Sequence, residues 1–279
     1  MVNAPELFRF RLNARIDHLP VSRRVRTIWI SDVHLGTRAS AAAPLLDFLR
    51  EYDCETLYIV GDLIDIWAMQ RTRYWPQQHN DVIQKILRKA RKDTRVVYIP
   101  GNHDEMLGSF AGSFGNIVIQ EHAIHSTADH RRILVIHGHE LDTVVQNVKW
   151  LAFAGDIAYE FLLSLNPLVN FVRRRFGVGG HWSLSAYAKK RVKNAVSFIG
   201  KFEEAVAKYA TRFPVDAVLC GHIHSADIRP FRKLTYYNCG DWVETCSALV
   251  EHHDGRIEIV WRRTSDVSLS QVGNRSAFA

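Results

Sequence analysis

Residues 28–36 read IWISDVHLG, an apolar run that ends at the carboxylate of Asp32 and is followed by the imidazole of His34. Isoleucine and tryptophan favour strands, so the sequence predicts a β-strand over Thr27–Ile30 with both polar residues beyond its carboxyl end. The same arrangement recurs in four later segments, TLYIVGD, VVYIPGNHD, ILVIHGH and AVLCGHIH, which end at Asp62, Asp104, His139 and His224. Because ligands of open α/β sheets gather outside the carboxyl ends of the strands, we expect these segments to meet at one site.

The first hundred residues alternate between strand and helix patterns. Strands are predicted over Thr27–Ile30, Leu57–Val60 and Arg95–Ile99, with helices from near Ser40 and over Asp81–Lys92. This alternation predicts a parallel, right-handed wound sheet covered by helices. Later short runs with turn signals predict a second, more mixed sheet packed on the first, and they are Ile117–Glu121, Ile133–Ile136, Ala217–Cys220, Leu234–Asn238, Ala248–Glu251 and Ile257–Trp261. The expected fold class is therefore α/β.

The stretch between His139 and Phe213 contains helical patterns that the sheets do not require. Residues 144–165 are apolar nearly all round, and apolar side chains recur every three or four positions over residues 184–209, opposite a row of lysines. We therefore expect a helical cap over residues 144–210, inserted in a main domain over residues 27–263, with a basic lead-in over residues 1–26 and a polar tail over residues 264–279. The alternatives are that the cap helices pack on the sheets or form a dimer interface.

Composition bounds the partners and the compartment. The 279 residues carry a formal charge of +7, which favours an anionic partner: nucleic acid, a phosphorylated small molecule or an acidic membrane surface. The four cysteines lie mostly in apolar runs without CxxC spacing, which indicates buried, reduced thiols. No leader-like apolar segment or membrane-spanning run is present in the sequence, so we expect a cytoplasmic protein.

The residues after the strand-like runs have the chemistry of metal ligands. Carboxylates, imidazoles and one amide oxygen form a seven-residue set: Asp32, His34, Asp62, Asn102, His137, His222 and His224. One ion cannot use them all, but two ions that share the carboxylate of Asp62 can. Any one of these short segments would more often be a turn or a surface loop. Five of them, all at the ends of predicted strands, predict a metal centre. Mixed nitrogen and oxygen donors favour manganese, iron or zinc, and two such ions can generate a hydroxide that attacks phosphorus.

The blocks DVH, GD, GNHD, HGH and GHIH, in this order over Thr27–Trp261, resemble the calcineurin-like metallophosphoesterase superfamily. The resemblance implies two packed β-sheets flanked by helices. It also implies that Asp32, His34, Asp62 and His224 hold one ion and that Asp62, Asn102, His137 and His222 hold the other.

Within that superfamily the chain looks most like the UDP-2,3-diacylglucosamine diphosphatase family of lipid A biosynthesis. The motifs that carry this resemblance are GDLIDIW, HGHELD, CGDW at Cys239–Trp242 and the basic, apolar insertion. It implies a manganese-dependent enzyme, peripheral on the cytoplasmic face of the inner membrane, that cleaves the pyrophosphate of a UDP-linked diacyl sugar to UMP and a lipid sugar 1-phosphate. An apolar cap would suit a diacylated substrate.

The basic residues of the insertion are candidate substrate contacts. Arg173, Arg174, Lys189 and Lys193 would face the pyrophosphate, together with Asn102 of the metal set. The alternative for the arginine run is a solvated face. Nucleic acid is not expected as a partner, because the basic residues are not interleaved with aromatic ones. The oligomeric state stays open.

One position departs from the family as its best-known members show it, because His103 stands where they carry arginine. A histidine there is the general acid expected for an alkoxide leaving group, as in phosphomonoesters and phosphodiesters. We expect His103 and Asn102 to stabilise the transition state and Asp104 to orient His103. The alternative function is thus a general phosphomonoesterase or phosphodiesterase acting on another substrate, nucleotides and nucleic acid included.

Overall fold

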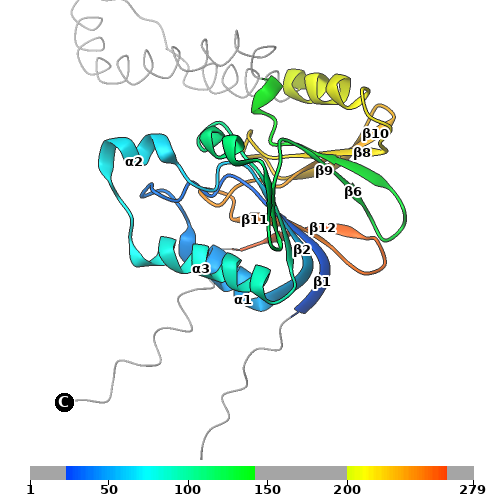
Figure 1. Ribbon diagram of the computed structural model, residues 1–279. Helices are drawn as coiled ribbons and strands as arrows, with labels where there is room; N and C mark the ends of the chain where they lie inside the picture. Colours follow the sequence, from blue (N-terminus) through cyan, green and yellow to red (C-terminus); the bar gives the residue numbers. More distant parts are fainter. Residues whose placement is uncertain (1–22, 142–199, 263–279) are drawn as a thin grey trace, which may run out of the picture.

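The structure is a computed structural model that describes residues 23–141 and 200–262. Figure 1 shows these residues as two β-sheets lying one on the other, with helices on both outer sides. The helices are α1 (Ala42–Glu51), α2 (Ile66–Thr72), α3 (Gln77–Arg91) and the 3₁₀-helices η1 (Glu105–Phe110) and η2 (His139–Leu141). The strands are β1 (Arg23–Ile30), β2 (Tyr52–Val60), β3 (Arg95–Ile99), β4 (Gly112–Phe114), β5 (Ile117–Ile119), β6 (Ala123–Ser126), β7 (Arg132–Val135), β8 (Ala217–Cys220), β9 (Asp227–Phe231), β10 (Leu234–Asn238), β11 (Ser247–Glu251) and β12 (Ile257–Trp261).

The strand order confirms the predicted α/β class with two packed sheets. Among the described residues, the larger sheet has the order β12-β11-β1-β2-β3-β5-β4 and the smaller one the order β6-β7-β8-β10-β9. Strands β1, β2 and β3 are parallel, and their registers pair Ile30 with Ile59 and Val60 with Ile99. The carboxyl ends of these strands therefore lie level at one edge of the sheet.

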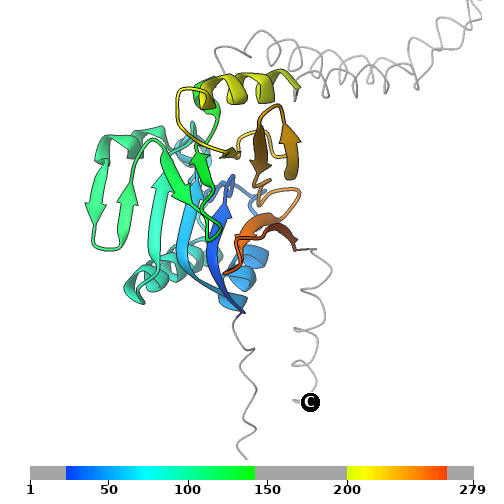
Figure 2. The ribbon, with the colours of Figure 1, turned by 90° about the vertical axis from the view of Figure 1, so that its right-hand side faces the viewer.

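The assignment of the later strands to a second sheet is wrong in part. Strands β5, β11 and β12 belong to the larger sheet, and Figure 2 shows the green hairpin β4–β5 at one edge of this sheet and the orange β11–β12 at the other. Strand β11 joins through antiparallel pairing with β1, where Val250 lies opposite Ile28. This pairing links residues far apart in the sequence, so the local strand pattern does not reveal it. Strand β1 also begins at Arg23, within the predicted lead-in.

The central strands are apolar without interruption because both of their faces are buried. In β1, Ile28 and Ile30 pack toward α1 and α3, whereas Trp29 between them packs toward the smaller sheet. Tyr58 and Val60 of β2 lie in the same inter-sheet core as Trp29. Alternate side chains thus build two different cores from one strand.

A third core lies on the outer face of the smaller sheet. Residues 200–210 are helical, and Phe202, Val206 and Ala210 pack there with Leu134 and Val218. The last turns of the predicted cap therefore cover the smaller sheet, as one of the alternatives proposed. The rest of the predicted cap lies outside the described residues.

The cysteines are buried, as their apolar sequence surroundings predict. Cys54, Cys220, Cys239 and Cys246 are all buried free thiols. Within the described ranges, no helix combines the length and the apolar character needed to cross a bilayer.

A buried carboxylate links the two sheets. Glu251 of β11 accepts hydrogen bonds from Thr27 (2.7 Å), from His125 of the smaller sheet (2.8 Å) and from the backbone N–H of Ala128 (2.7 Å). Arg26 adds an ion pair at 2.6 Å. Burial alone would raise the pKa of Glu251, but the hydrogen bonds from His125, Thr27 and Ala128 lower this pKa from 4.5 to about 2.

We predict that Glu251→Gln lowers the free energy of unfolding by about 3 kcal/mol at pH 7, because the amide cannot replace the buried charge. A carboxyl whose pKa is lower in the folded state stabilises the protein above its unfolded pKa, and this contribution is lost as the pH falls. The difference between parent and variant should therefore narrow below about pH 4.5 and vanish near pH 2, given the folded pKa of about 2. Urea unfolding at pH 7 and at lower pH measures both quantities.

Glu258→Gln is the control, because the side chain of Glu258 is 44% exposed while it pairs with His252 and Arg256. Its substitution should cost less than about 1 kcal/mol. Equal losses in the free energy of unfolding for the two variants would contradict the proposal that the buried charge of Glu251 stabilises the fold.

Candidate metal centre

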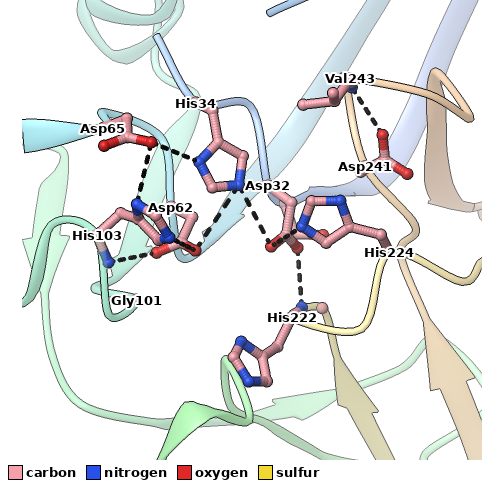
Figure 3. A network of polar contacts seen from close by, with 12 residues as sticks. Asp32, His34, Asp62, Asp65, Gly101, His103, His222, His224, Asp241 and Val243 are labelled. Atoms are coloured by element: carbon pink, nitrogen blue, oxygen red, sulfur yellow. Dashed lines mark hydrogen bonds and ion pairs between the residues drawn. The ribbon is translucent and has the colours of Figure 1, made fainter. Parts of the chain in front are cut away.

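The predicted ligands come together at one edge of the two sheets. Asp32, Asp62 and Asn102 follow the parallel strands β1, β2 and β3, and His137 and the pair His222 and His224 follow β7 and β8, which are also parallel. Figure 3 shows the side chains of Asp32, His34, Asp62 and His224 facing one another in this region. The five segments predicted to meet at a site therefore do meet.

Backbone hydrogen bonds hold the first two loops against each other. The N–H groups of Val33 and His34 donate to the carbonyl of Asp62 at 3.0 and 2.9 Å, and the N–H of Asp65 donates to the carbonyl of Leu35 at 2.8 Å. The β1 and β2 loops thus continue side by side beyond their strands. This pairing sets the positions of the carboxylates and of the His34 ring.

Two glycines, Gly61 and Gly101, allow side chains of other loops to approach the backbone closely. A Cβ atom built on Gly61 would overlap the ring of His137, and one built on Gly101 would overlap the carboxylate of Asp62. The GD and GNHD segments therefore begin with glycine because a side chain from another loop of the site packs directly on the backbone.

The ligands have an unusual backbone conformation. Asp32, His34, Asp62, His222 and His224 all have positive φ angles, between 51° and 66°. Residues with a side chain rarely adopt this region, and the strain costs about 1 kcal/mol or more for each residue. Strain of this kind concentrates at functional sites, where it aims side chains that a regular strand would point elsewhere.

The donor atoms form three overlapping groups. His224 Nε2 lies 3.2 Å from Asp32 Oδ1, and His137 Nε2 lies 3.5 Å from Asp62 Oδ2. His34 Nε2 lies between the two carboxylates, 4.0 Å from Asp32 Oδ1 and 3.9 Å from Asp62 Oδ2. The groups are Asp32 with His34 and His224, Asp32 with Asp62 and His137, and Asp62 with His34 and His103. Each carboxylate thus belongs to two groups of nearby donor atoms.

Hydrogen bonds orient the rings of His34 and His137. His137 Nδ1 lies 2.9 Å from the carbonyl oxygen of Val60, which can only accept, so Nδ1 is the donor and, in the neutral ring that binds metal, Nε2 carries the lone pair. His34 Nδ1 lies 3.3 Å from Asp65 Oδ2, which fixes the same tautomer. Both rings therefore present Nε2 lone pairs toward Asp32 and Asp62, the arrangement typical of metal-binding histidines.

Three buried polar atoms show whether the predicted ligand set suits metal ions. Among the described residues, His34 Nε2, His137 Nε2 and Asn102 Oδ1 have no hydrogen-bond partner. Buried polar atoms without partners are destabilising and rare. A cation that accepts their lone pairs would satisfy all of them, so the donor set fits divalent ions.

The charge balance also favours cations. Burial would raise the pKa of Asp32, but the adjacent His224 and His137 outweigh burial and hold this pKa below its ordinary value of 3.8. Burial would lower the pKa of His137, yet Asp62 and Asp32 raise it to about 10. The buried carboxylates thus bind positive charge strongly, and metal ions would displace protons from the histidines.

The sequence model of the calcineurin-like phosphoesterases matches residues 25–226, a range that contains every ligand named above. The chain belongs to the calcineurin-like phosphoesterase family. It is accordingly a metal-dependent phosphoesterase, and the three donor groups are candidate sites for divalent metal ions.

Two relatives match most of this calcineurin-like phosphoesterase and nearly the whole of their own length. A protein of Psychromonas ingrahamii named UDP-2,3-diacylglucosamine hydrolase is 26% identical over 250 residues, which cover 85% of this chain and 98% of the relative. The protein of the same name from Photorhabdus laumondii is 26% identical over 86% of this chain and 97% of its own length. A solved structure of Vps29 from Entamoeba histolytica is 14% identical over 85% of this chain and 99% of its own, with a TM-score of 0.40.

Divalent ions in this family's site supply Lewis acidity, which polarises a phosphoryl group and acidifies water. The chain itself provides His103 at the rim of the site. His103 Nδ1 lies 3.0 Å from Asp65 Oδ2, and Nε2 lies 4.0 Å from Asp62 Oδ2. A carboxylate at Nδ1 leaves Nε2 as the ring atom that can give a proton to a leaving group.

Asp65, not Asp104, therefore takes the expected role of orienting His103. The carboxylate of Asp104 already accepts from the backbone N–H groups of Gly101 (2.7 Å) and Ile64 (3.2 Å) and from the hydroxyl of Tyr98. Asp104 thus holds the β2 and β3 loops together. Asp65 contacts both His34 and His103, and its position just before the apolar start of α2 is the helix-capping signal by which it could have been noticed.

The remaining predicted residues fall into two groups. His222 donates its backbone N–H to Asp32 Oδ2 at 2.9 Å, and its ring centroid lies 5.1 Å from that of His137. The candidate substrate contacts Arg173, Arg174, Lys189 and Lys193 lie outside the described residues.

We predict that Gly101→Ala lowers the affinity for divalent metal by about 10- to 100-fold, because the added methyl group displaces the carboxylate of Asp62. Calorimetric titration of the metal-free protein with manganese measures the affinity. Gly108→Ala is the control, since a Cβ there would meet only Pro100 Cγ at 3.9 Å. A Gly101→Ala protein that binds metal as the parent does would refute the close-approach argument.

Proposed function

We propose that the protein hydrolyses the pyrophosphate bond of UDP-2,3-diacylglucosamine, in lipid A biosynthesis, to give UMP and a diacylglucosamine 1-phosphate. The observation that carries the proposal is that relatives named for this activity match nearly their whole length to a chain whose ligand loops are complete. A water oxygen bonds to the phosphorus that is attached to the uridine, and the protons of the water pass to solvent. The bond from this phosphorus to the bridging oxygen breaks, and that oxygen leaves as part of the sugar phosphate. The sugar phosphate is a stable anion and leaves without receiving a proton.

The proposal includes the cofactor and the surroundings of the substrate. Two manganese ions would bind the seven-ligand set, with iron or zinc as alternatives. Arg173, Arg174, Lys189 and Lys193 would contact the pyrophosphate, and the apolar cap would accept the acyl chains. The net charge of +7 would favour peripheral contact with the anionic cytoplasmic face of a membrane.

The first test compares UDP-2,3-diacylglucosamine with bis-p-nitrophenyl phosphate as substrates, both with manganese. We expect kcat/KM to favour the lipid by at least about 100-fold, and Asp62→Ala to reduce both activities by more than about 100-fold because it removes a shared ligand. Measuring UMP release gives the first rate and nitrophenolate absorbance the second. Turnover of bis-p-nitrophenyl phosphate without turnover of the lipid would overturn the proposed substrate. An Asp62→Ala variant whose kcat/KM stays within about tenfold of the parent's would overturn the assignment of Asp62 as a metal ligand.

A second candidate function rests on the contact between His103 and Asp65. A histidine oriented by a carboxylate and placed beside the metal ligands is suited to protonating an alkoxide, which a pyrophosphate does not produce. This geometry favours hydrolysis of phosphomonoesters or phosphodiesters by the same centre.

The variant His103→Gln separates these two chemistries. It should slow hydrolysis of an alkyl phosphodiester by about 100-fold or more, because the alkoxide then leaves unprotonated. Hydrolysis of UDP-2,3-diacylglucosamine should fall by less than about tenfold, since its leaving group needs no proton. Steady-state kcat on the two substrates is the measurement, and equal losses would show that His103 acts on the attacked phosphoryl group instead.

A further inference from the structure

A cavity of about 500 Å³ adjoins the metal centre on the side of His103. Helix α2 contributes Trp67 and Gln70 to its lining, and η1 contributes Glu105 and Met106. Asn102 and His103 line it where it meets the metal ligands. A group bound in this cavity would therefore be attached directly to the phosphate under attack.

Trp67 is the aromatic residue in the lining of this cavity. Its side chain is 51% exposed, which is unusual for the largest apolar residue type. Its ring lies 4.7 Å from the ring of His103, with the two planes 39° apart. An exposed ring beside an active-site histidine is a platform on which a planar group can stack.

The polar groups of the cavity restrict its occupant further. The amide of Gln70 offers both a donor and an acceptor, which can match the edge of a heterocycle. The carboxylate of Glu105 can accept from sugar hydroxyls and would repel a further phosphate. Among the described residues that line the cavity, none is a lysine or an arginine. A long acyl chain would leave these polar groups without partners.

We propose that this cavity binds the nucleoside part of the substrate, with the base stacked on Trp67. The inference rests on the proposed function for the identity of the base, uracil. The nucleoside then lies on the α2 and η1 side of the phosphate, and Trp67 contributes to substrate specificity.

The test is calorimetric binding of UMP and of ribose 5-phosphate, which lacks the base, to the full-length protein with manganese. UMP should bind the parent about 10- to 100-fold more tightly than ribose 5-phosphate does, as base stacking contributes. Trp67→Ala should abolish most of this difference and leave the affinity for ribose 5-phosphate within about twofold. Trp67→Phe should retain most of the affinity for UMP, because a smaller ring can still stack.

Trp261→Ala is the matched control, since Trp261 is 52% exposed and lies on β12 at the far edge of the larger sheet. It should change neither affinity. Equal binding of UMP and ribose 5-phosphate by the parent would overturn the inference. So would a Trp67→Ala variant that loses affinity for both ligands equally, because Trp67 would then act through His103 alone.

Turnover distinguishes this inference from the proposed function. A protein that binds UMP through Trp67 but does not hydrolyse UDP-2,3-diacylglucosamine would overturn the proposed substrate and support the nucleoside site. A protein that hydrolyses the lipid while Trp67→Ala leaves UMP binding unchanged would support the function and overturn the site.

Discussion

The burial of two carboxylates between the sheets is the constraint on which the rest of this structure depends. Asp32 is fully buried and Asp62 is 2% exposed, and both belong to the same cluster of donor atoms. Two like charges taken out of water cost several kcal/mol each unless opposite charges and hydrogen bonds surround them. The histidines that follow the smaller sheet's strands supply positive charge, and the backbone N–H groups of His103 and His222 supply hydrogen bonds. Metal ions bound there would add further positive charge.

The same constraint explains the local backbone. Ligands from both sheets reach one small volume only if the chain turns sharply at each strand end, and five ligands do so with positive φ angles. This strain persists because the loops are tied together by Asp104 and by the pairing of the β1 and β2 loops. The apolar cores on both faces of the larger sheet stabilise the fold and so offset the cost of a strained, charged site.

Asp65 connects the metal centre to the catalytic rim. Its carboxylate touches a ligand histidine, His34, and the candidate proton donor, His103, while it caps α2 through the N–H of Ala68. The helix that it caps carries Trp67 and Gln70 to the adjoining cavity. A single side chain thus couples the orientation of a metal ligand, an acid and the wall of the nucleoside site that we propose.

The sequence by itself predicted the parallel core and the side chains that gather at the edge of the sheets, because both depend on local pattern: an apolar strand that stops at a potential metal ligand leaves few other interpretations. Only the tertiary structure decided which residues distant in the sequence contact one another. The antiparallel pairing of β11 with β1, the position of Asp65 rather than Asp104 beside His103 and the place of Trp67 in the lining of a cavity depend on contacts between residues distant in sequence or on rotamers. No periodicity encodes such contacts, since they are chosen by the packing of the whole molecule.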